Sequence, residues 1–254
     1  MATCRSARYG RLVSCQLGCY ERTPMSTILL IHGTWLGGWV WDRVVPLLRD
    51  SGHTIIAPDL PGLAGDSAAA SAGIDPSVHA AAIVDLLERS DLQDVVLVGH
   101  SYGGIVAREA ATSTRVGRII YLDAFLPEAG ESAFDLIPWL ADAFVPVDDE
   151  RPWLIAPLPP QALGIEDVDD VAWLAANMTP MPLATHSTAA AAVARVVPST
   201  YVWCEVQPLM VEMAERARAR GYDVVGIPTA HLPMVTHPEL LAAAVDAAAK
   251  GRNR

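Results

Sequence analysis

The chain is poor in lysine, in aromatic residues and in long apolar runs. Lys250 is the only lysine among 254 residues, aromatic residues make up 6%, and the formal net charge is −11 at pH 7. This acidic excess disfavours nucleic acids and anionic membrane surfaces as partners. No apolar run approaches the roughly 18 residues that a membrane-spanning helix requires, so no membrane span is expected.

Motifs for metals and nucleotide cofactors are missing as well. The sequence has no His-Glu-x-x-His run, no phosphate-binding loop and no dinucleotide fingerprint, so we expect neither a metal nor an organic cofactor. Of the four cysteines, Cys4, Cys15 and Cys19 lack paired zinc-ligand spacing, and Cys204 stands far from them.

Residues 1–24 contain arginines but no continuous apolar region, so they are a poor secretory signal, and a cytoplasmic location is expected. We expect these residues to form a flexible extension, because Met25 directly precedes the first convincing strand. The alternatives are that these residues result from an upstream start choice, or that residues 11–17 add an edge strand.

Apolar runs alternate with helical patterns from residue 27 onward, as in a doubly wound parallel sheet. Continuous apolar runs are typical of strands that are buried on both faces. The expected strands are Thr27–Ile31, Thr54–Ala57, Val95–Val98, Arg118–Leu122, Ser199–Cys204 and Asp223–Ile227. The expected helices are Trp41–Asp50, Pro76–Arg89, Tyr102–Thr112, Pro208–Arg220 and Pro238–Lys250. The length suits one α/β domain with an insertion.

The alternation stops between Leu122 and Ser199, in a stretch rich in proline, tryptophan and acidic residues. This stretch is too long and too apolar for a plain loop. We expect residues 128–190 to form a small helical cap, with residues 25–127 and 191–254 as the core. Candidate linings of a pocket under the cap are Trp139, Phe144, Trp173 and Met178, although each could instead pack only within the cap.

A Gly-x-Ser-x-Gly motif, Gly99-His100-Ser101-Tyr102-Gly103, joins an apolar strand to a helical pattern. In this context the motif indicates a nucleophile elbow, whose sharp turn exposes the Ser101 hydroxyl above the sheet. Glycines flank the serine because a Cβ there would clash with neighbouring backbone. An incidental serine in a glycine-rich turn is the competing interpretation.

Two further segments fit a serine nucleophile. His32-Gly33-Thr34 follows the strand that ends at Ile31, and an oxyanion hole could use the backbone N–H groups of Thr34 and Tyr102. His231 lies in the last predicted strand-to-helix loop, where a general base is expected.

The remaining histidines are weaker candidates. His237 is interpreted as a solvated residue at a helix start, His32 and His100 as loop braces, His53 and His79 as surface residues, and His186 as a weaker candidate for the pocket.

Six segments together resemble the α/β-hydrolase branch that includes plant methyl esterases, hydroxynitrile lyases and bacterial esterase-like relatives. They are LIHGTW (30–35), GGWVW (37–41), APDLPG (57–62), GHSYGG (99–104), YLDAFLP (121–127) and HLPM (231–234). The resemblance implies an α/β fold with a doubly wound, mostly parallel sheet and a small helical cap inserted after the sixth strand. It also implies a serine esterase acting on a small-molecule ester, and a homodimer is left open. The substrate-binding candidates are Trp35, Phe125, Trp139 and Leu232.

The acidic member of the catalytic triad is left open by the sequence. In relatives an aspartate follows the strand corresponding to Ser199–Cys204, but that register falls on Gln207, an amide. Glu205 lies in the same loop, and Asp123 ends the preceding strand; both strand ends lie at one edge of a parallel sheet. We favour Asp123 over Glu205. Capping of the turn into the cap is the competing role for Asp123.

Two alternatives to ester hydrolysis follow from the same residues. A lyase, cyclase or acyl transferase could use Ser101 and His231, but the lysine that follows the catalytic histidine in hydroxynitrile lyases is replaced here by Leu232. A ligand-binding protein with a degenerate triad is the other alternative, because of Gln207.

Overall fold

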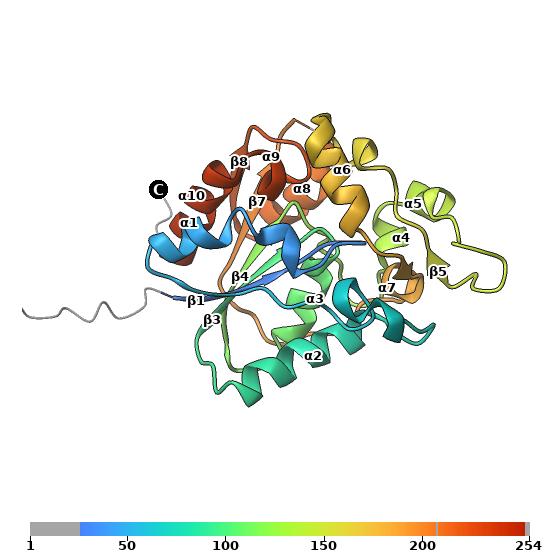
Figure 1. Cartoon of the computed structure of the whole chain (residues 1–254). Helices are drawn as coiled ribbons and strands as arrows, with labels where there is room; N and C mark the ends of the chain where they lie inside the picture. The colour runs from blue at the N-terminus through green and yellow to red at the C-terminus, as the bar shows by residue number, and fades with distance from the viewer. Residues whose placement is uncertain (1–25, 207, 252–254) are drawn as a thin grey trace, which may run out of the picture.

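A parallel sheet with helices on both faces forms the centre of the molecule (Figure 1). The computed structural model describes residues 26–206 and 208–251, so the predicted extension over residues 1–24, its alternative edge strand and Gln207 lie outside the described residues. The strand order is β2-β1-β3-β4-β7-β8. The strands are β1 (Thr27–Ile31), β2 (Thr54–Ile56), β3 (Val95–His100), β4 (Val116–Leu122), β7 (Ser199–Cys204) and β8 (Asp223–Ile227). This arrangement confirms the predicted α/β-hydrolase sheet.

Helices pack on the two faces of the sheet. One face is covered by α2 (Pro76–Arg89), α3 (Gly103–Ala110) and α8 (Val211–Ala219), and the other by α1 (Val45–Asp50), α9 (Pro233–Thr236) and α10 (Pro238–Ala249). Among the helices of the described residues, none combines the length and apolar character that crossing a bilayer requires.

The strands separate two apolar cores. Leu29 and Ile31 of β1 point into the core under α2, α3 and α8, whereas Ile28 and Leu30 point into the core under α1 and α10. Because successive side chains of a strand point to opposite faces, a strand between two layers of helices must be apolar at every position. All four of these side chains are fully buried, which explains the unbroken apolar runs of the sequence.

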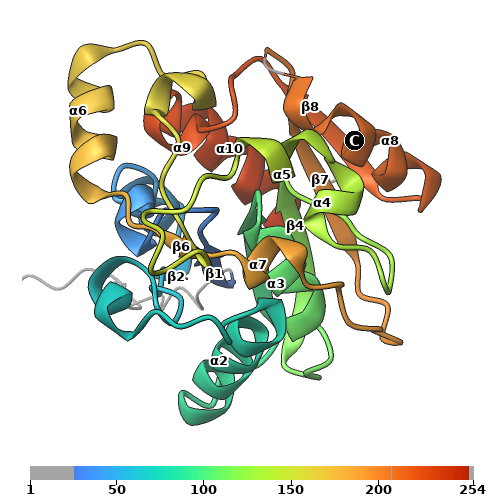
Figure 2. The ribbon, with the colours of Figure 1, turned by 90° about the vertical axis from the view of Figure 1, so that its right-hand side faces the viewer.

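The segment between β4 and β7 contains only short elements. They are α4 (Ala133–Leu136), α5 (Trp139–Ala143), β5 (Leu154–Ile155), η3 (Pro160–Leu163), α6 (Val168–Asn177), β6 (Met181–Pro182) and α7 (Ala184–Ser187). Figure 1 shows these elements on the right, and Figure 2 looks onto that end with α6 on one side and α4 and α5 on the other. We call residues 128–190 the inserted segment. The expected position after the sixth strand was wrong: the segment follows the fourth strand, because only β1, β2 and β3 precede β4 among the described residues.

Most predicted elements begin and end close to the observed ones. Strands β1, β7 and β8 and helix α2 have the predicted bounds. Helix α2 begins at Pro76 because the Asp75 carboxylate accepts a hydrogen bond from the Val78 N–H, a typical N-cap.

Two predicted helices differ from the observed ones at their starts. The helix predicted from Trp41 begins only at Val45, after the 3-10 helix η1 (Gly38–Trp41). The helix predicted from Pro208 begins with the 3-10 turn η4 (Pro208–Met210). The 3-10 helix η2 (Ala64–Ala69) follows β2.

Candidate functional site

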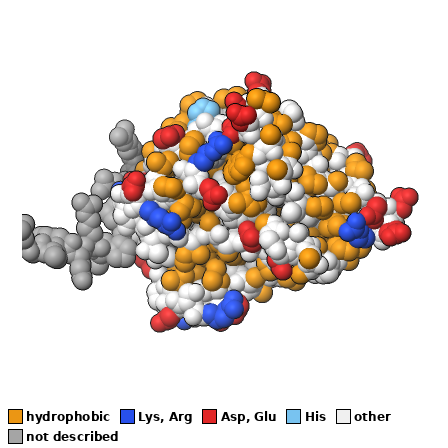
Figure 3. Space-filling view, viewed as in Figure 1, with side chains coloured by type: hydrophobic (Ala, Val, Ile, Leu, Met, Phe, Trp, Pro, Cys, Tyr) orange, Lys and Arg blue, Asp and Glu red, His pale blue; other side chains and the backbone are white. Residues whose placement is uncertain are grey.

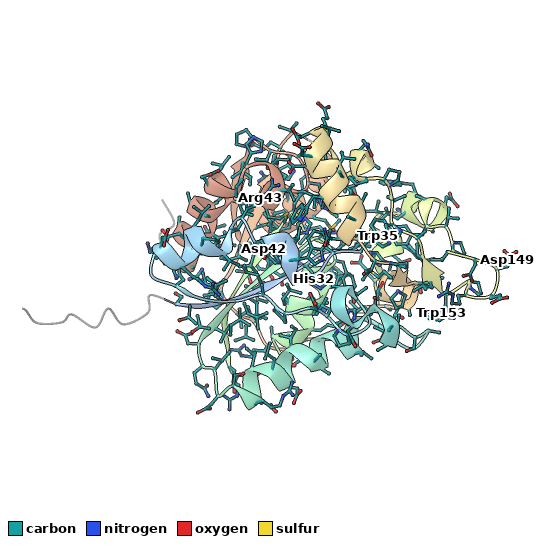
Figure 4. The ribbon with its side chains drawn as sticks, in the orientation of Figure 1. His32, Trp35, Asp42, Arg43, Asp149 and Trp153 are labelled. Carbon is teal, nitrogen blue, oxygen red and sulfur yellow. The ribbon has the colours of Figure 1, made fainter. Side chains whose placement is uncertain are left out.

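The site lies where the loops after β1, β3, β4 and β8 meet the inserted segment. A cavity of about 530 Å³ opens there, and Thr34, Ser101, Phe125 and His231 from the four loops all line it. Ligands of doubly wound sheets bind at this carboxyl edge. Figure 4 labels Trp35, which follows β1 and lies where the sheet meets the inserted segment.

Ser101 occupies a strained turn between β3 and α3. Its φ is 52°, in the left-handed region that non-glycine residues rarely adopt. The glycines on either side allow the turn to close. A Cβ on Gly99 would lie 2.4 Å from the Gly103 carbonyl oxygen, and a Cβ on Gly103 would lie 2.6 Å from the Ile31 carbonyl oxygen. The sequence therefore folds this motif as a nucleophile elbow.

His231 follows β8 and is paired with Asp123. The Asp123 Oδ2 lies 2.7 Å from the His231 Nδ1, and both side chains are buried. Asp123 Oδ1 accepts a hydrogen bond from the Cys204 N–H at 3.2 Å. The Tyr201 hydroxyl donates to the Ala124 carbonyl oxygen at 2.8 Å and accepts from the Ala124 N–H, so it braces the loop that carries Asp123. A carboxylate at Nδ1 fixes the proton on that nitrogen and leaves Nε2 free to accept one.

The other candidate acid points elsewhere. Glu205 is exposed, and its carboxylate lies against Gly226, whose Cβ would come within 2.1 Å of the Glu205 Oε1. Gln207 lies outside the described residues. Of the two carboxylates considered from the sequence, the structure brings Asp123 and not Glu205 to the imidazole.

Ser101 and His231 line the same cavity, but no hydrogen bond joins their side chains in the described residues. Hydrogen bonds between such groups are often long or poorly aligned until a substrate binds. The Ser101 and His231 side chains therefore face the same, mostly apolar cavity.

Two backbone N–H groups are available beside Ser101. Within the described part of the chain, neither the Thr34 N–H nor the Tyr102 N–H donates to a protein acceptor. Tyr102 is the N-cap residue of α3, where the positive end of the helix dipole favours a developing oxyanion. Trp35, next to Thr34, has a φ of 63°, so this loop is strained as well.

Two buried histidines brace the loops of the site. The His100 Nε2–H donates to the His231 carbonyl oxygen at 2.9 Å, and the His32 Nε2 accepts from the Leu60 N–H at 3.1 Å. Burial lowers the pKa of His32 to about 4 and the pKa of His100 well below its usual value. Both imidazoles are therefore neutral near pH 7, and both act as the expected loop braces.

The cavity walls are mostly apolar. All four substrate-binding candidates lie in the wall: Trp35, Phe125, Trp139 and Leu232. Phe144 also lines the cavity, and its ring lies 5.2 Å from that of Trp35. Trp139 is 54% exposed and so lies at the mouth.

Two further lining candidates were wrong. Trp173 and Met178 do not line the cavity. Trp173 packs edge-on against Trp39 at 4.9 Å and lies under the guanidinium of Arg43. Met178 packs against the two apolar cores.

The environment of a single histidine carries little signal in the sequence. His79 was predicted on the surface but is buried, with Nδ1 2.8 Å from the Tyr102 hydroxyl. His53 was also predicted on the surface but is buried, and its Nε2 contacts Asp246 at 2.8 Å. His186, only a weaker candidate, lines the cavity. His237 is exposed at the start of α10, as predicted.

The wall contributed by Leu209 and Met210 of η4 and by Met213 of α8 was not foreseen, because which helical side chains face a cavity depends on tertiary packing. Among the described residues, no group of three or more His, Cys, Asp and Glu side chains is arranged to hold a metal ion.

Comparison with known proteins identifies several relatives. A sequence profile described as "Alpha/beta hydrolase family" matches residues 28–244. A carbendazim hydrolyzing esterase from Nocardioides sp. (strain SG-4G) is 29% identical over 174 residues, which are 64% of this chain and 72% of that protein. An alpha-hydroxynitrile lyase from Arabidopsis thaliana is 32% identical over 112 residues, which are 39% of this chain and 40% of the lyase.

The solved structure of an extracellular alpha/beta-hydrolase from a Paenibacillus species superimposes with a TM-score of 0.76 and 22% identity. The match covers 90% of this chain and 100% of that chain. At this identity the likeness shows the fold. The distant relatives include an esterase and a lyase, so reaction type has to be argued from the site itself.

Proposed function

The chain belongs to the alpha/beta hydrolase family, and on that premise we propose that it is a serine esterase that cleaves small or medium-sized carboxylic esters. One observation carries the proposal. A strained serine at an elbow turn shares an apolar cavity with a histidine whose Nδ1 is held by a buried carboxylate. This combination provides a nucleophile, a general base and an orienting acid.

The proposed reaction begins with attack of Ser101 Oγ on the ester carbonyl carbon, while His231 Nε2 takes the hydroxyl proton. Asp123 holds the resulting imidazolium through Nδ1–H. The Thr34 and Tyr102 N–H groups stabilise the oxyanion of the tetrahedral intermediate, and loss of one such donor costs about 2.7–4 kcal/mol. Collapse of the intermediate breaks the C–O bond, and the alcohol leaves with the proton from His231.

The acyl-enzyme is then hydrolysed by the reverse sequence of proton transfers. His231 takes a proton from water, the hydroxide adds to the acyl carbon, and Ser101 leaves with the proton. The apolar wall around Ser101 favours an acyl or alcohol group without charge, and a cavity of about 530 Å³ holds a compact molecule. The name of the Nocardioides relative, an esterase, supports the same reaction type.

The proposal is tested by hydrolysis of p-nitrophenyl acetate, with Ser101→Ala as the matched control. We expect release of p-nitrophenol that is saturable for the wild-type protein and reduced to the background rate in the variant. A fluorophosphonate probe serves as the second measurement. Labelling of the wild type without hydrolysis would favour a non-hydrolytic enzyme, and absence of both would favour a ligand-binding protein.

A further inference from the structure

A chain of hydrogen bonds runs from the inserted segment to the cavity wall. The Thr185 Oγ1 lies 2.6 Å from the Pro182 carbonyl oxygen and 2.8 Å from the His186 Nδ1. The His186 Nε2 in turn lies 3.0 Å from the Thr34 Oγ1. Thr185 and His186 are buried, whereas Thr34 is partly exposed and lines the cavity beside Ser101.

The donor and the acceptor of each of these hydrogen bonds can be assigned in turn, starting from the Pro182 carbonyl oxygen. A carbonyl oxygen only accepts, so Thr185 donates its single hydroxyl proton to Pro182. The contact between Thr185 and His186 then requires the His186 Nδ1 to carry the proton and donate it. Burial lowers the pKa of His186 to about 3, so the ring is neutral and its Nε2 can only accept.

Thr34 is therefore the donor in the last bond. Its only hydroxyl proton points at His186 Nε2, and its oxygen has only lone pairs left for any other partner. The Thr34 side chain thus faces the cavity as an acceptor, although a threonine hydroxyl can in general act as either donor or acceptor.

Aromatic rings hold His186 in the orientation that this bond requires. The Tyr102 ring stacks on the imidazole with centroids 5.1 Å apart and an interplanar angle of 24°. The Phe144 and Phe125 rings lie edge-on at 4.9 and 6.0 Å. A rotation of the imidazole would disrupt these contacts, so the acceptor character of Thr34 is built into the packing of the site.

We propose that Thr34 Oγ1 selects esters with a hydroxyl group on the carbon next to the carbonyl; this rests on the proposed esterase function. Three covalent bonds, N–Cα, Cα–Cβ and Cβ–Oγ1, separate the Thr34 backbone nitrogen from its hydroxyl oxygen. The carbonyl oxygen and the α-hydroxyl oxygen of a 2-hydroxy ester are also separated by three bonds. When the carbonyl oxygen accepts from the Thr34 N–H, the α-hydroxyl can donate to Oγ1, whereas a methoxy group at that position has no proton to donate.

The experiment measures binding of intact esters to the Ser101→Ala variant. Methyl mandelate, methyl phenylacetate and methyl α-methoxyphenylacetate differ only in the α-substituent, and their dissociation constants are obtained by calorimetry. We expect methyl mandelate to bind about threefold to tenfold more tightly than methyl phenylacetate, which is the range of one net hydrogen bond. Methyl α-methoxyphenylacetate is expected to bind most weakly.

Three double variants, each with one substitution added to Ser101→Ala, identify the residue responsible for the preference for methyl mandelate. Thr34→Val removes the acceptor, so the ratio of the first two dissociation constants should fall to about 1, while Thr34→Ser should keep the preference. Thr185→Val leaves Thr34 in place but frees the proton of His186 to move to Nε2. The Thr34 hydroxyl can then donate into the cavity, and the penalty on the methoxy ester should shrink.

Equal binding of mandelate and phenylacetate esters to the Ser101→Ala variant would overturn the proposal, as would a preference that persists after Thr34→Val. Because these esters are not turned over by a protein without Ser101, the binding result stands apart from the catalytic one. A wild-type protein that hydrolyses no ester would refute the proposed function and leave the acceptor role of Thr34 to be decided by the same dissociation constants.

Discussion

The Asp123 carboxylate contacts the His231 imidazole from the end of β4. Leu122 of β4 pairs with Val202 of β7, so the ends of the two neighbouring strands lie at the same edge of the sheet. A carboxylate after either strand could therefore face a histidine from the loop after β8. The sequence leaves Asp123 and Glu205 both open because side-chain direction in a loop depends on the whole sheet edge. In the structure Asp123 has a φ of 41°, which turns its side chain to His231.

Substitution of the two carboxylates separates their roles. Asp123→Asn keeps the size of the side chain but removes the charge that holds the correct tautomer, and should lower kcat/KM for p-nitrophenyl acetate by about 10³–10⁴-fold. Glu205→Gln, the matched control, should change it by less than about threefold because the Glu205 side chain lies against Gly226 and not at the imidazole. The reverse pattern would reassign the acid to Glu205.

At the scale of elements, the turn between β3 and α3 depends on close backbone approach. A Cβ on Gly103 would lie 2.6 Å from the Ile31 carbonyl oxygen and 2.7 Å from that of His32. Both neighbours are backbone atoms at the end of β1, and they cannot move without displacing the strand. This approach joins segments that lie far apart in the sequence, but the glycines that it requires lie within the Gly-x-Ser-x-Gly motif, which is why the motif predicts the turn.

Two glycine-to-alanine substitutions, one at the turn and one at an open position, measure this steric constraint. Gly103→Ala should lower the free energy of unfolding by about 1–3 kcal/mol through overpacking. Gly73→Ala is the control, because no heavy atom lies within 4 Å of its added Cβ, and we expect a change below about 1 kcal/mol. Urea unfolding of both variants gives the comparison, and equal stability of the two would contradict the proposed tight approach of β1 and α3.

The inserted segment is the element that the sequence described least well. Its composition predicted helices and an apolar pocket wall, but Trp173 of α6 packs against Trp39 and not on the cavity. The apolar periodicity of a short helix does not show which neighbour it will face. The same limit applies to His186, whose position at the cavity depends on rings from four separate segments.

For the whole molecule, the alternation of strands and helices is enough to predict the layers and the parallel sheet, because a strand between two helical layers must be apolar throughout. Burial of single polar residues is not predicted in the same way: His53 and His79 looked like surface residues and are buried. Figure 3 shows one face of the molecule, where Lys and Arg side chains are scattered among Asp and Glu and do not gather into a basic patch. The lack of a basic patch on this face is consistent with the formal net charge of −11.

Buried neutral histidines make stability depend on pH. Burial lowers the pKa values of His32 and His79 to about 4 and that of His186 to about 3. These groups bind protons in the unfolded chain from about pH 6.5 downward but remain neutral in the folded protein until the pH approaches 4 or 3. The contribution of these neutral histidines to the free energy of unfolding is therefore fully present above pH 6.5 and decreases as the pH falls.

The free energy of unfolding should decrease between pH 7.5 and 5.5 by about 1 kcal/mol for each of these histidines. Urea unfolding at three or more pH values in this range measures the slope. The carboxylates with lowered pKa values, such as Glu131 and Asp246, act only below this window. A free energy of unfolding that does not change over the window would show that these imidazoles are not held neutral.

Covalent labelling of the serine tests the central claim most directly. The intact protein is treated with a fluorophosphonate, digested, and analysed by mass spectrometry, with Ser101→Ala treated in parallel. We predict a single adduct on the peptide that contains Ser101, formed more slowly after Asp123→Asn and absent in Ser101→Ala. An adduct on another residue, or no adduct on the folded wild-type protein, would contradict the assignment of Ser101 as an activated nucleophile.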